Sequence, residues 1–182
     1  MVETPSTMIN LGTPIPPFTL KDCHGNEWNK STHVRGTLVI FMCNHCPFVI
    51  HIAEVLPKIH EACSVAGIQM VGINSNDIEN YPADSPEYMM MTAEENNWTF
   101  PYLFDADQSV AKAFDAACTP DVFLYDHSGN LFYRGQVDDS RPNSGINSDG
   151  KDLLEAIECL RTSSSAPEHQ KPAIGCNIKW KP

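Results

Sequence analysis

The residues that decide the fold are Thr37-Leu38-Val39-Ile40-Phe41-Met42-Cys43-Asn44-His45-Cys46-Pro47-Phe48-Val49. They open as a continuous apolar run, which is the pattern of a strand buried on both faces of a sheet. They continue into Cys-x-x-Cys and a proline. Beyond the proline, apolar residues recur at helical spacing, at Val49, Ile52, Leu56, Ile59 and Cys63. The sequence therefore predicts a strand, then two cysteines, then a helix.

This order places at least one thiol at the N-terminus of a helix, where unpaired N–H groups and the helix dipole stabilise a thiolate. Proline is favoured at the first helical position because its missing N–H would have no intrahelical partner. With Pro47 at that position, Cys46 is the N-cap and Cys43 lies upstream in the loop. We therefore expect Cys46 to be the attacking sulfur and Cys43 to resolve it. The opposite assignment, with Cys43 attacking, stays open.

Composition limits the class of protein and its partners. The chain has 182 residues, 42% hydrophobic and 19% charged, which suits a globular domain with a full core. Its formal net charge of −11 argues against nucleic acid or an anionic membrane as a partner. No apolar run is long enough to span a bilayer, and no secretory signal is visible. We expect a cytoplasmic protein, in which a close cysteine pair is redox-active or metal-binding rather than structural.

Turn signals and periodicity predict the other elements. Asp22-Cys23-His24-Gly25-Asn26 is the turn of a short N-terminal hairpin. Pro57 is expected to bend the helix after the cysteines, and Gly67 to cap its end. Further helices are predicted from Tyr88 to Trp98, Ser109 to Ala117 and Gly150 to Thr162, and strands from Ile68 to Ile73, Val122 to Tyr125 and Leu131 to Gln136.

The chain reads as one domain with a tail. Residues 1–162 form the predicted domain, since no internal repeat or second core is visible. Ser163-Ser164-Ser165-Ala166-Pro167 has the composition of a linker. The end of the chain, from Ile174 to Trp180, is too apolar to be simply disordered. We expect the tail, residues 163–182, to pack on the domain.

The element order resembles a thioredoxin-fold redoxin of the alkyl hydroperoxide reductase/thiol-specific antioxidant (AhpC/TSA) family. The resemblance is carried by the CNHC motif Cys43-Asn44-His45-Cys46-Pro47, by Pro57, and by Cys118-Thr119-Pro120 at the start of a later strand. It covers roughly Leu11 to Leu160. It implies a thioredoxin-like α/β fold, with a central mixed sheet flanked by helices, an N-terminal hairpin and, in this chain, a C-terminal extension.

The resemblance also implies a role for the Thr-Pro pair. In this family the proline is cis and faces the active-site sulfur, and Thr119-Pro120 matches that position. A cis X–Pro bond costs only about 0.5–1 kcal/mol relative to trans, so packing can enforce it. The alternative is a trans proline as the first residue of a strand. We expect Pro120 to be cis and both residues to lie in the site.

The chain departs from the pattern of its relatives in two ways. Counted from the central strand, the first cysteine of thioredoxin-like proteins falls at Cys46, and their second would fall at Val49. Peroxiredoxins carry Thr or Ser three residues before the attacking cysteine, where this chain has Cys43. A peroxide would therefore lack its usual hydroxyl partner, which argues against efficient peroxidase chemistry.

Four other places are candidates for the site or its surroundings. Cys118 precedes the Thr-Pro pair and Cys176 lies in the apolar tail, so either is a relay thiol or a small buried apolar residue. His45 either favours the Cys46 thiolate by carrying positive charge or exposes its ring to solvent. The charged loop from Asp138 to Pro142 either lines the mouth of the site or is solvated, and we expect it to be solvated.

Three functions fit these residues. The leading one is thiol–disulfide exchange through Cys43 and Cys46, with disulfide-containing proteins or small disulfides as partners and a thiol as reductant. The second is a peroxiredoxin-like peroxidase, in which Cys46 becomes a sulfenic acid that Cys43 or Cys118 resolves. The third is a zinc or copper site formed by Cys43, Cys46, Cys118 and Cys176, with His45 as a further ligand. It is disfavoured because the chain has no second pair of closely spaced cysteines. No cofactor or resident metal is expected.

Overall fold

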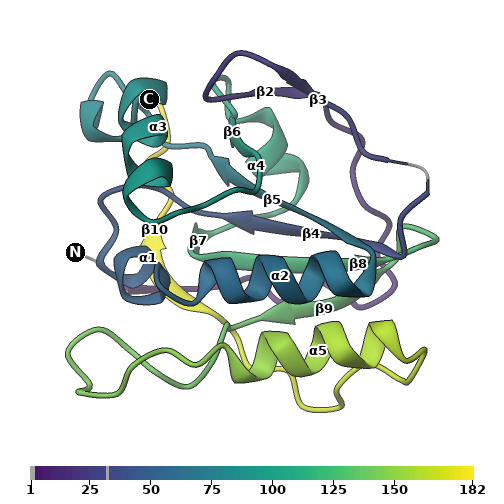
Figure 1. Cartoon of the computed structure of the whole chain (residues 1–182). Coiled ribbons are helices and arrows are strands. Elements are labelled where there is room, and N and C mark those ends of the chain that lie inside the picture. The colour runs from purple at the N-terminus through teal and green to yellow at the C-terminus, as the bar shows by residue number, and fades with distance from the viewer. Residues whose placement is uncertain (1–2, 32) are drawn as a thin grey trace.

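The computed structural model describes residues 3–31 and 33–182, which fold around a seven-stranded sheet (Figure 1). Its strand order is β3-β2-β6-β5-β4-β8-β9. These strands are β2 (Leu20–Asp22), β3 (Glu27–Trp28), β4 (Gly36–Phe41), β5 (Ile68–Asn74), β6 (Tyr102–Phe104), β8 (Asp121–Asp126) and β9 (Leu131–Gly135). A smaller sheet, of order β1-β10-β7, contains β1 (Glu3–Pro5), β7 (Cys118–Thr119) and β10 (Ile174–Asn177).

Helices flank the larger sheet. They are α1 (Pro47–Ile52), α2 (Leu56–Ala66), the 3₁₀ helix η1 (Pro82–Asp84), α3 (Pro86–Glu95), α4 (Ser109–Ala113) and α5 (Lys151–Arg161). Apolar residues of α1, α2, α3 and α5 belong to the core on one face of the sheet, and those of α4 to the core on the other. Figure 1 shows α2 and α5 side by side in front of the strands.

β4 is the centre of the sheet, as its apolar run predicts. It pairs with β5 in parallel and with β8 antiparallel, and all of its residues are buried. Leu38 and Ile40 enter the core under α2, whereas Val39 and Phe41 enter the core on the opposite face. The mixed sheet with helices on both faces confirms the predicted thioredoxin-like fold, and the antiparallel pairing of β2 with β3 confirms the hairpin.

The helix after the cysteines is broken, whereas a bend was predicted. α1 ends at Ile52, and α2 begins at Leu56 with Pro57 in its first turn. Inside a continuous helix this proline would remove a hydrogen bond and crowd the preceding turn, but in a first turn it costs neither. The chain therefore starts a new helix there and leaves α1 as a short separate element. Gly67 ends α2 with a φ of 71°, as predicted.

Other helices are shorter than predicted. α3 ends at Glu95 instead of Trp98, and α4 ends at Ala113 instead of Ala117. Asn97 and Asp115, with φ values of 55° and 54°, adopt the left-handed conformation just beyond these ends. That conformation turns the chain out of the helix and stops its hydrogen-bond ladder.

The C-terminal segment, yellow in Figure 1, runs along one side of the molecule from β10 near α1 to the C-terminus beside α3. β10 pairs with β7, with Cys176 opposite Thr119 and Asn177 opposite Cys118, and it pairs with β1 on its other side. A Cβ at Gly175 would lie 2.1 Å from the carbonyl oxygen of Thr119. Only glycine allows this close approach, so Gly175 lets β10 lie directly against the Thr-Pro peptide.

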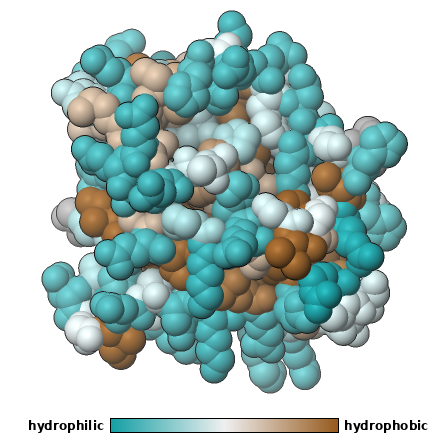
Figure 2. Space-filling view, viewed as in Figure 1, coloured by the Kyte–Doolittle hydropathy of each residue, from teal (hydrophilic) through white to brown (hydrophobic). Residues whose placement is uncertain are grey.

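The surface on the α2 side is mostly hydrophilic, with apolar side chains concentrated over α2 (Figure 2). Val65 of this helix is 75% exposed. Within residues 3–31 and 33–182, no helix is long and apolar enough to cross a bilayer.

Candidate functional site

The site is built at the point where β4 ends and α1 begins. Cys43 follows β4, and Cys46 is the N-cap of α1, with φ of −70° and ψ of 121°. Pro47 is the first residue of the helix. This geometry confirms the capping arrangement that the sequence predicts, and it directs the positive end of α1 toward Cys46.

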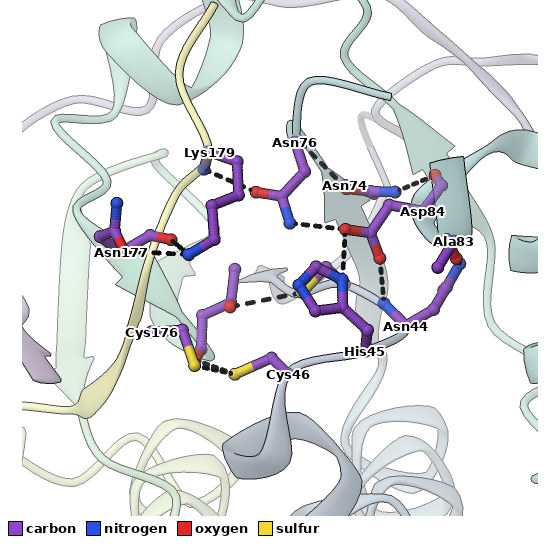
Figure 3. A network of polar contacts seen from close by, with 12 residues as sticks. Asn44, His45, Cys46, Asn74, Asn76, Ala83, Asp84, Cys176, Asn177 and Lys179 are labelled. Carbon is purple, nitrogen blue, oxygen red and sulfur yellow. Dashed lines mark hydrogen bonds and ion pairs between the residues drawn. The ribbon is translucent and has the colours of Figure 1, made fainter. Parts of the chain in front are cut away.

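Three thiols and Thr119 meet at this point. Figure 3 shows the sulfurs of Cys46 and Cys176 facing each other. Cys46 Sγ lies 3.0 Å from Cys176 Sγ of β10 and 3.1 Å from the carbonyl oxygen of Thr119. Cys43 Sγ lies 3.6 Å from the hydroxyl oxygen of the same threonine. The structure therefore brings together four residues that are spread over more than 130 positions of the sequence.

The peptide bond between Thr119 and Pro120 is cis, as predicted. Pro120 lies between β10 and α1, where it lines a small cavity together with Phe48, His51 and Ile174. Both residues of the pair are buried. Thr119 and Pro120 thus lie against the N-terminal end of α1, where the carbonyl oxygen of Thr119 contacts Cys46.

The thiols of Cys43 and Cys46 have opposite pKa shifts. A hydrogen bond from Cys43 holds the pKa of Cys46 well below that of an ordinary thiol, against the effect of burial, and a hydrogen bond from Cys176 adds to this. The same hydrogen bond to Cys46, together with burial, raises the pKa of Cys43 well above its usual value. Burial and the hydrogen bond to Cys46 raise the pKa of Cys176 to about 12. Cys46 therefore has the lowest pKa of the three thiols.

Thr119 contacts Cys46 in two ways: a hydrogen bond from its hydroxyl lowers the pKa of Cys46, whereas its carbonyl oxygen favours the protonated thiol. Its carbonyl oxygen accepts a hydrogen bond from Cys46 only while this thiol keeps its proton. A thiolate at the same place faces a negative oxygen. The two thiol donors must outweigh this contact, so the balance depends on both Cys43 and Cys176 staying in place.

His45 forms an ion pair with a residue that sequence reasoning missed. Its Nδ1 lies 2.7 Å from a carboxylate oxygen of Asp84, and its ring stacks on Tyr81 at a centroid distance of 5.8 Å. The close contact with the Asp84 carboxylate raises the pKa of His45. The side chain of His45 is 36% exposed, so it carries its charge at the surface of the site beside Cys46.

Asp84 holds the loop between β4 and α1. The carboxylate is fully buried and accepts hydrogen bonds from the main-chain N–H of Asn44, at 2.8 Å, and from the amide of Asn76, at 2.8 Å (Figure 3). Burial raises its pKa, but the hydrogen bonds from His45 and Asn76 outweigh burial and leave the pKa below its usual value. The sequence carries one signal for this residue, an acidic group next to the Ser85-Pro86 helix start, and that signal points to helix capping rather than to the site.

Cys118, the other predicted relay thiol, contacts a different group. Its Sγ lies 3.5 Å from the carbonyl oxygen of Pro120, and burial, with the charge of Asp121 beside it, raises its pKa. It is fully buried next to Thr119. The hydrogen bond of Cys118 is thus made with Pro120, whereas Cys46 and Cys176 contact each other.

One group of side chains could hold a metal ion. Ligand atoms of Cys43, His45 and Asp84 lie within 4.8 Å of one another. The carboxylate of Asp84, however, is already the acceptor for Asn44 and Asn76. These contacts make Asp84 a positioning residue for the loop and His45, and a metal would have to compete with them.

The loop after β9 was expected to be solvated, and this is wrong for Asp138, which is 4% exposed. Its carboxylate accepts hydrogen bonds from the N–H groups of Ser140, Asp149 and Gly150 and from the Ser140 and Ser148 hydroxyls. These bonds tie the loop to the start of α5, because buried acceptors must find donors. Arg141 is thereby held beside α1, in the wall of a cavity that also includes Phe48 and Cys176.

Comparisons with known proteins agree with this geometry. A profile of the AhpC/TSA family matches residues 11–134. The chain is 47% identical to a conserved protein from Geobacillus kaustophilus, whose crystal structure superposes with a TM-score of 0.95 over 100% of this chain and 98% of that one. A hypothetical protein from Sinorhizobium meliloti 1021 is 42% identical, with a TM-score of 0.95 and 98% of both chains covered. The thiol-disulfide oxidoreductase ResA of Geobacillus kaustophilus (strain HTA426) is 24% identical over 129 residues, which are 70% of each chain.

The matched residues, 11–134, make up more than half of the 182 residues, and this range contains Cys43, Cys46 and the cis Thr119-Pro120 pair. The curated relative carries out thiol–disulfide oxidoreduction according to its name. Sequence, fold and site therefore agree on a redoxin-type oxidoreductase, and the chain belongs to the AhpC/TSA family.

Proposed function

We propose that the chain is a thiol–disulfide oxidoreductase in which Cys43 and Cys46 are the redox pair and Cys46 attacks. The observation that carries this proposal is the place of Cys46: it is the N-cap residue of α1, its Sγ lies 3.0 Å from Cys176 Sγ, and hydrogen bonding with Cys43 and Cys176 lowers its pKa. The thiolate is the nucleophile in disulfide exchange. The helix N-terminus and the two donors supply it near neutral pH.

The exchange proceeds through a mixed disulfide. The Cys46 thiolate attacks one sulfur of the partner disulfide, so a bond forms between Cys46 and the partner while the partner disulfide breaks and releases a thiolate. Cys43 then gives its proton to that thiolate and attacks Cys46 Sγ. The Cys43–Cys46 disulfide forms, and the second partner sulfur leaves as a thiolate that takes a proton from water. The partner is then a dithiol, and two electrons have passed to it from the protein.

Access to Cys46 requires β10 to move, since Cys46 is 0% exposed and Cys176 covers it. β10 is joined to β7 by the facing of Cys176 with Thr119 and of Asn177 with Cys118. An extended partner segment would find the same main-chain donors and acceptors on β7 once β10 leaves. The partner class that fits is therefore a disulfide in an extended or unfolded segment.

A trapping experiment tests the assignment. The Cys43→Ser/Cys176→Ser variant lacks both thiols that contact Cys46, so we expect it to accumulate mixed disulfides with a model disulfide protein, seen as bands that dithiothreitol removes. Cys46→Ser is expected to form none, and Cys159→Ser is the control for a thiol away from the site. If Cys46→Ser traps partners and the double variant does not, Cys43 is the attacking sulfur.

The burial of Cys46 favours a second candidate function, the reduction of a peroxide. A peroxide is small enough to reach a thiol that a protein disulfide cannot reach without moving β10. Attack on the O–O bond gives a sulfenic acid at Cys46 and water or an alcohol, and condensation with Cys43 or Cys176 then releases water. The hydroxyl of Thr119, near Cys43, is a hydrogen-bond partner for the peroxide. Stopped-flow oxidation by hydrogen peroxide decides: a rate no faster than that of an ordinary thiol rejects this candidate.

A further inference from the structure

The three thiols at the start of α1 differ in how a solute reaches them. Cys43 is 1% exposed and Cys46 is 0% exposed. Cys176 is also buried, at 4% exposed, but unlike the other two it forms part of the wall of a cavity of about 220 Å³ beside Phe48 and Arg141. A small molecule in this cavity meets Cys176 first, and Cys46 lies directly behind it at 3.0 Å.

β10 holds Cys176 firmly in this position. The strand is paired on both sides, with Cys176 facing Thr119 of β7 and Glu3 of β1. Gly175 brings the strand against the Thr-Pro peptide, since any Cβ there would collide with the Thr119 carbonyl. The contact between Cys46 and Cys176 is thus set by main-chain pairing, which positions the two sulfurs for repeated reaction.

We propose that Cys176 is a relay thiol, which takes the disulfide from the Cys43–Cys46 pair and presents it to a low-molecular-weight thiol bearing a carboxylate in the adjacent cavity. This inference rests on the proposed thiol–disulfide exchange and names the reductant for the same site. A protein reductant is excluded from a cavity of this size, whereas a small thiol fits.

Each step is a balanced disulfide exchange. Cys176 attacks Cys46 Sγ, so the Cys46–Cys176 bond forms, the Cys43–Cys46 bond breaks, and Cys43 takes up the proton that Cys176 loses. The external thiolate then attacks Cys176 Sγ and releases Cys46 as a thiolate. A second external thiol displaces the first from Cys176. The sum is one protein disulfide reduced to a dithiol and two external thiols joined as their disulfide.

The charges around the sulfurs fit this direction. Cys46 has the lowest pKa of the three thiols, so it is the best leaving group when the external thiol attacks Cys176. The hydrogen bond and the charge from Cys46 that raise the pKa of Cys176 are absent while Cys46 is part of a disulfide. The nearby Lys179 then favours the attacking Cys176 thiolate.

Arg141 accounts for the carboxylate on the reductant. Its guanidinium donates hydrogen bonds to the carbonyl oxygens of Asp138 and Ser140 and to the side-chain oxygen of Gln136, all of them uncharged acceptors. Among the described residues it forms no ion pair. The cavity wall contains one acidic side chain, Glu3, and one basic side chain, Arg141, so Arg141 is the group of this wall that can bind a carboxylate.

Disulfide mapping tests the relay directly. Trypsin leaves both motif cysteines in peptide 36–58 and Cys176 in peptide 162–179, so a Cys46–Cys176 bond joins two peptides and a Cys43–Cys46 bond stays within one. After one equivalent of diamide, we expect the joined peptides in the wild type and in Cys43→Ser, with Cys159→Ser as the control. Formation of the Cys43–Cys46 bond without any joined peptides would overturn the relay and leave the proposed function intact. If Cys46 forms no disulfide at all, both proposals fail.

Reduction kinetics give the second test. Oxidised Cys176→Ser is expected to be reduced by glutathione at least about 10-fold more slowly than the wild type, because the buried Cys43–Cys46 disulfide has lost the thiol that lines the cavity. Gly175→Ala, which keeps every thiol but pushes β10 away, is expected to be slowed as well. Arg141→Gln is expected to slow reduction by glutathione but not by the uncharged 2-mercaptoethanol. Equal rates of glutathione reduction in wild type and Cys176→Ser would reject the relay, and equal losses with both reductants in Arg141→Gln would reject the carboxylate.

Discussion

Two buried cysteines of the same domain, Cys46 at the start of α1 and Cys63 within α2, are both 0% exposed. Burial raises the pKa of Cys63 to about 12. Cys46 has its pKa lowered, because Cys43 and Cys176 donate hydrogen bonds to it and outweigh the same burial. The two helices therefore hold one thiol as an inert apolar side chain and the other as a thiolate.

The difference shows that burial alone does not decide the reactivity of a thiol. Within α2 the main-chain N–H groups are used by the helix itself, so Cys63 finds no donor for a charged sulfur. At the N-terminus of α1 the first N–H groups have no helical partners, and two further thiols converge there. A reactive cysteine of this fold is a buried sulfur with donors around it.

Removal of each sulfur gives the largest expected contrast. Cys46→Ser is expected to lower the rate of insulin disulfide reduction by about 10³-fold or more, since no other thiol here has a lowered pKa. Cys63→Ser is expected to change the rate less than about twofold at a temperature where it stays folded. Circular dichroism checks that both variants are folded. Comparable losses from both substitutions would mean that activity follows stability and not the thiolate.

The pH dependence of alkylation separates the two thiols next. An ordinary thiol with a pKa of about 8.5 keeps only about 0.3% of its thiolate at pH 6. With its lowered pKa, Cys46 is expected to keep most of its plateau rate with iodoacetamide at pH 6. Cys63 should be labelled only after unfolding in denaturant. If the alkylation rate of Cys46 had its pH midpoint near that of an ordinary thiol, the pKa of Cys46 would not be lowered and the proposed difference from Cys63 would be wrong.

Local signals predicted one half of the site. The apolar run gives the buried β4, Pro47 gives the start of α1, and the Thr119-Pro120 pair gives the turn beside it. Each depends on residues that are neighbours in the chain, or on a motif. Such features can be inferred from a single sequence, because propensity and capping act over a few residues.

Long-range contacts supply the other half, and these carry no local signal. Asp84 reaches His45 from a different loop, and Cys176 reaches Cys46 from 130 positions away. The tail was expected to pack on the domain, but its register on β7, which decides that Cys176 and not Cys118 contacts Cys46, follows from the pairing of strands. Register depends on the whole sheet and on the close approach at Gly175, so the sequence leaves it open.

The carboxylate of Asp84 stabilises the loop that carries Cys46, where it accepts a hydrogen bond from the main-chain N–H of Asn44. Its pKa is lowered in the folded protein, so its stabilising effect is present above the unfolded value of about 3.9 and is lost as the pH falls through the folded value. Asp84→Asn is expected to lower the free energy of unfolding by about 2 kcal/mol at pH 7 and by less at pH 3, measured by urea denaturation. The exposed Asp115→Asn is the control, and an equal loss at both pH values would contradict the charge as the cause.

The smallest effect isolates one donor. Cys176→Ala removes a hydrogen bond with Cys46 and changes no residue of α1, so the pKa of Cys46 should rise. A hydrogen bond to a charged group is worth about 1.5 kcal/mol or more, which moves the midpoint of the alkylation profile upward by about one pH unit. Cys176→Ser keeps an O–H donor and should shift the midpoint less, although it lacks the sulfur. An unchanged midpoint in both variants would mean that Cys43 and the helix alone keep Cys46 different from Cys63, whereas a graded shift shows that the tail contributes to the thiolate at the start of α1.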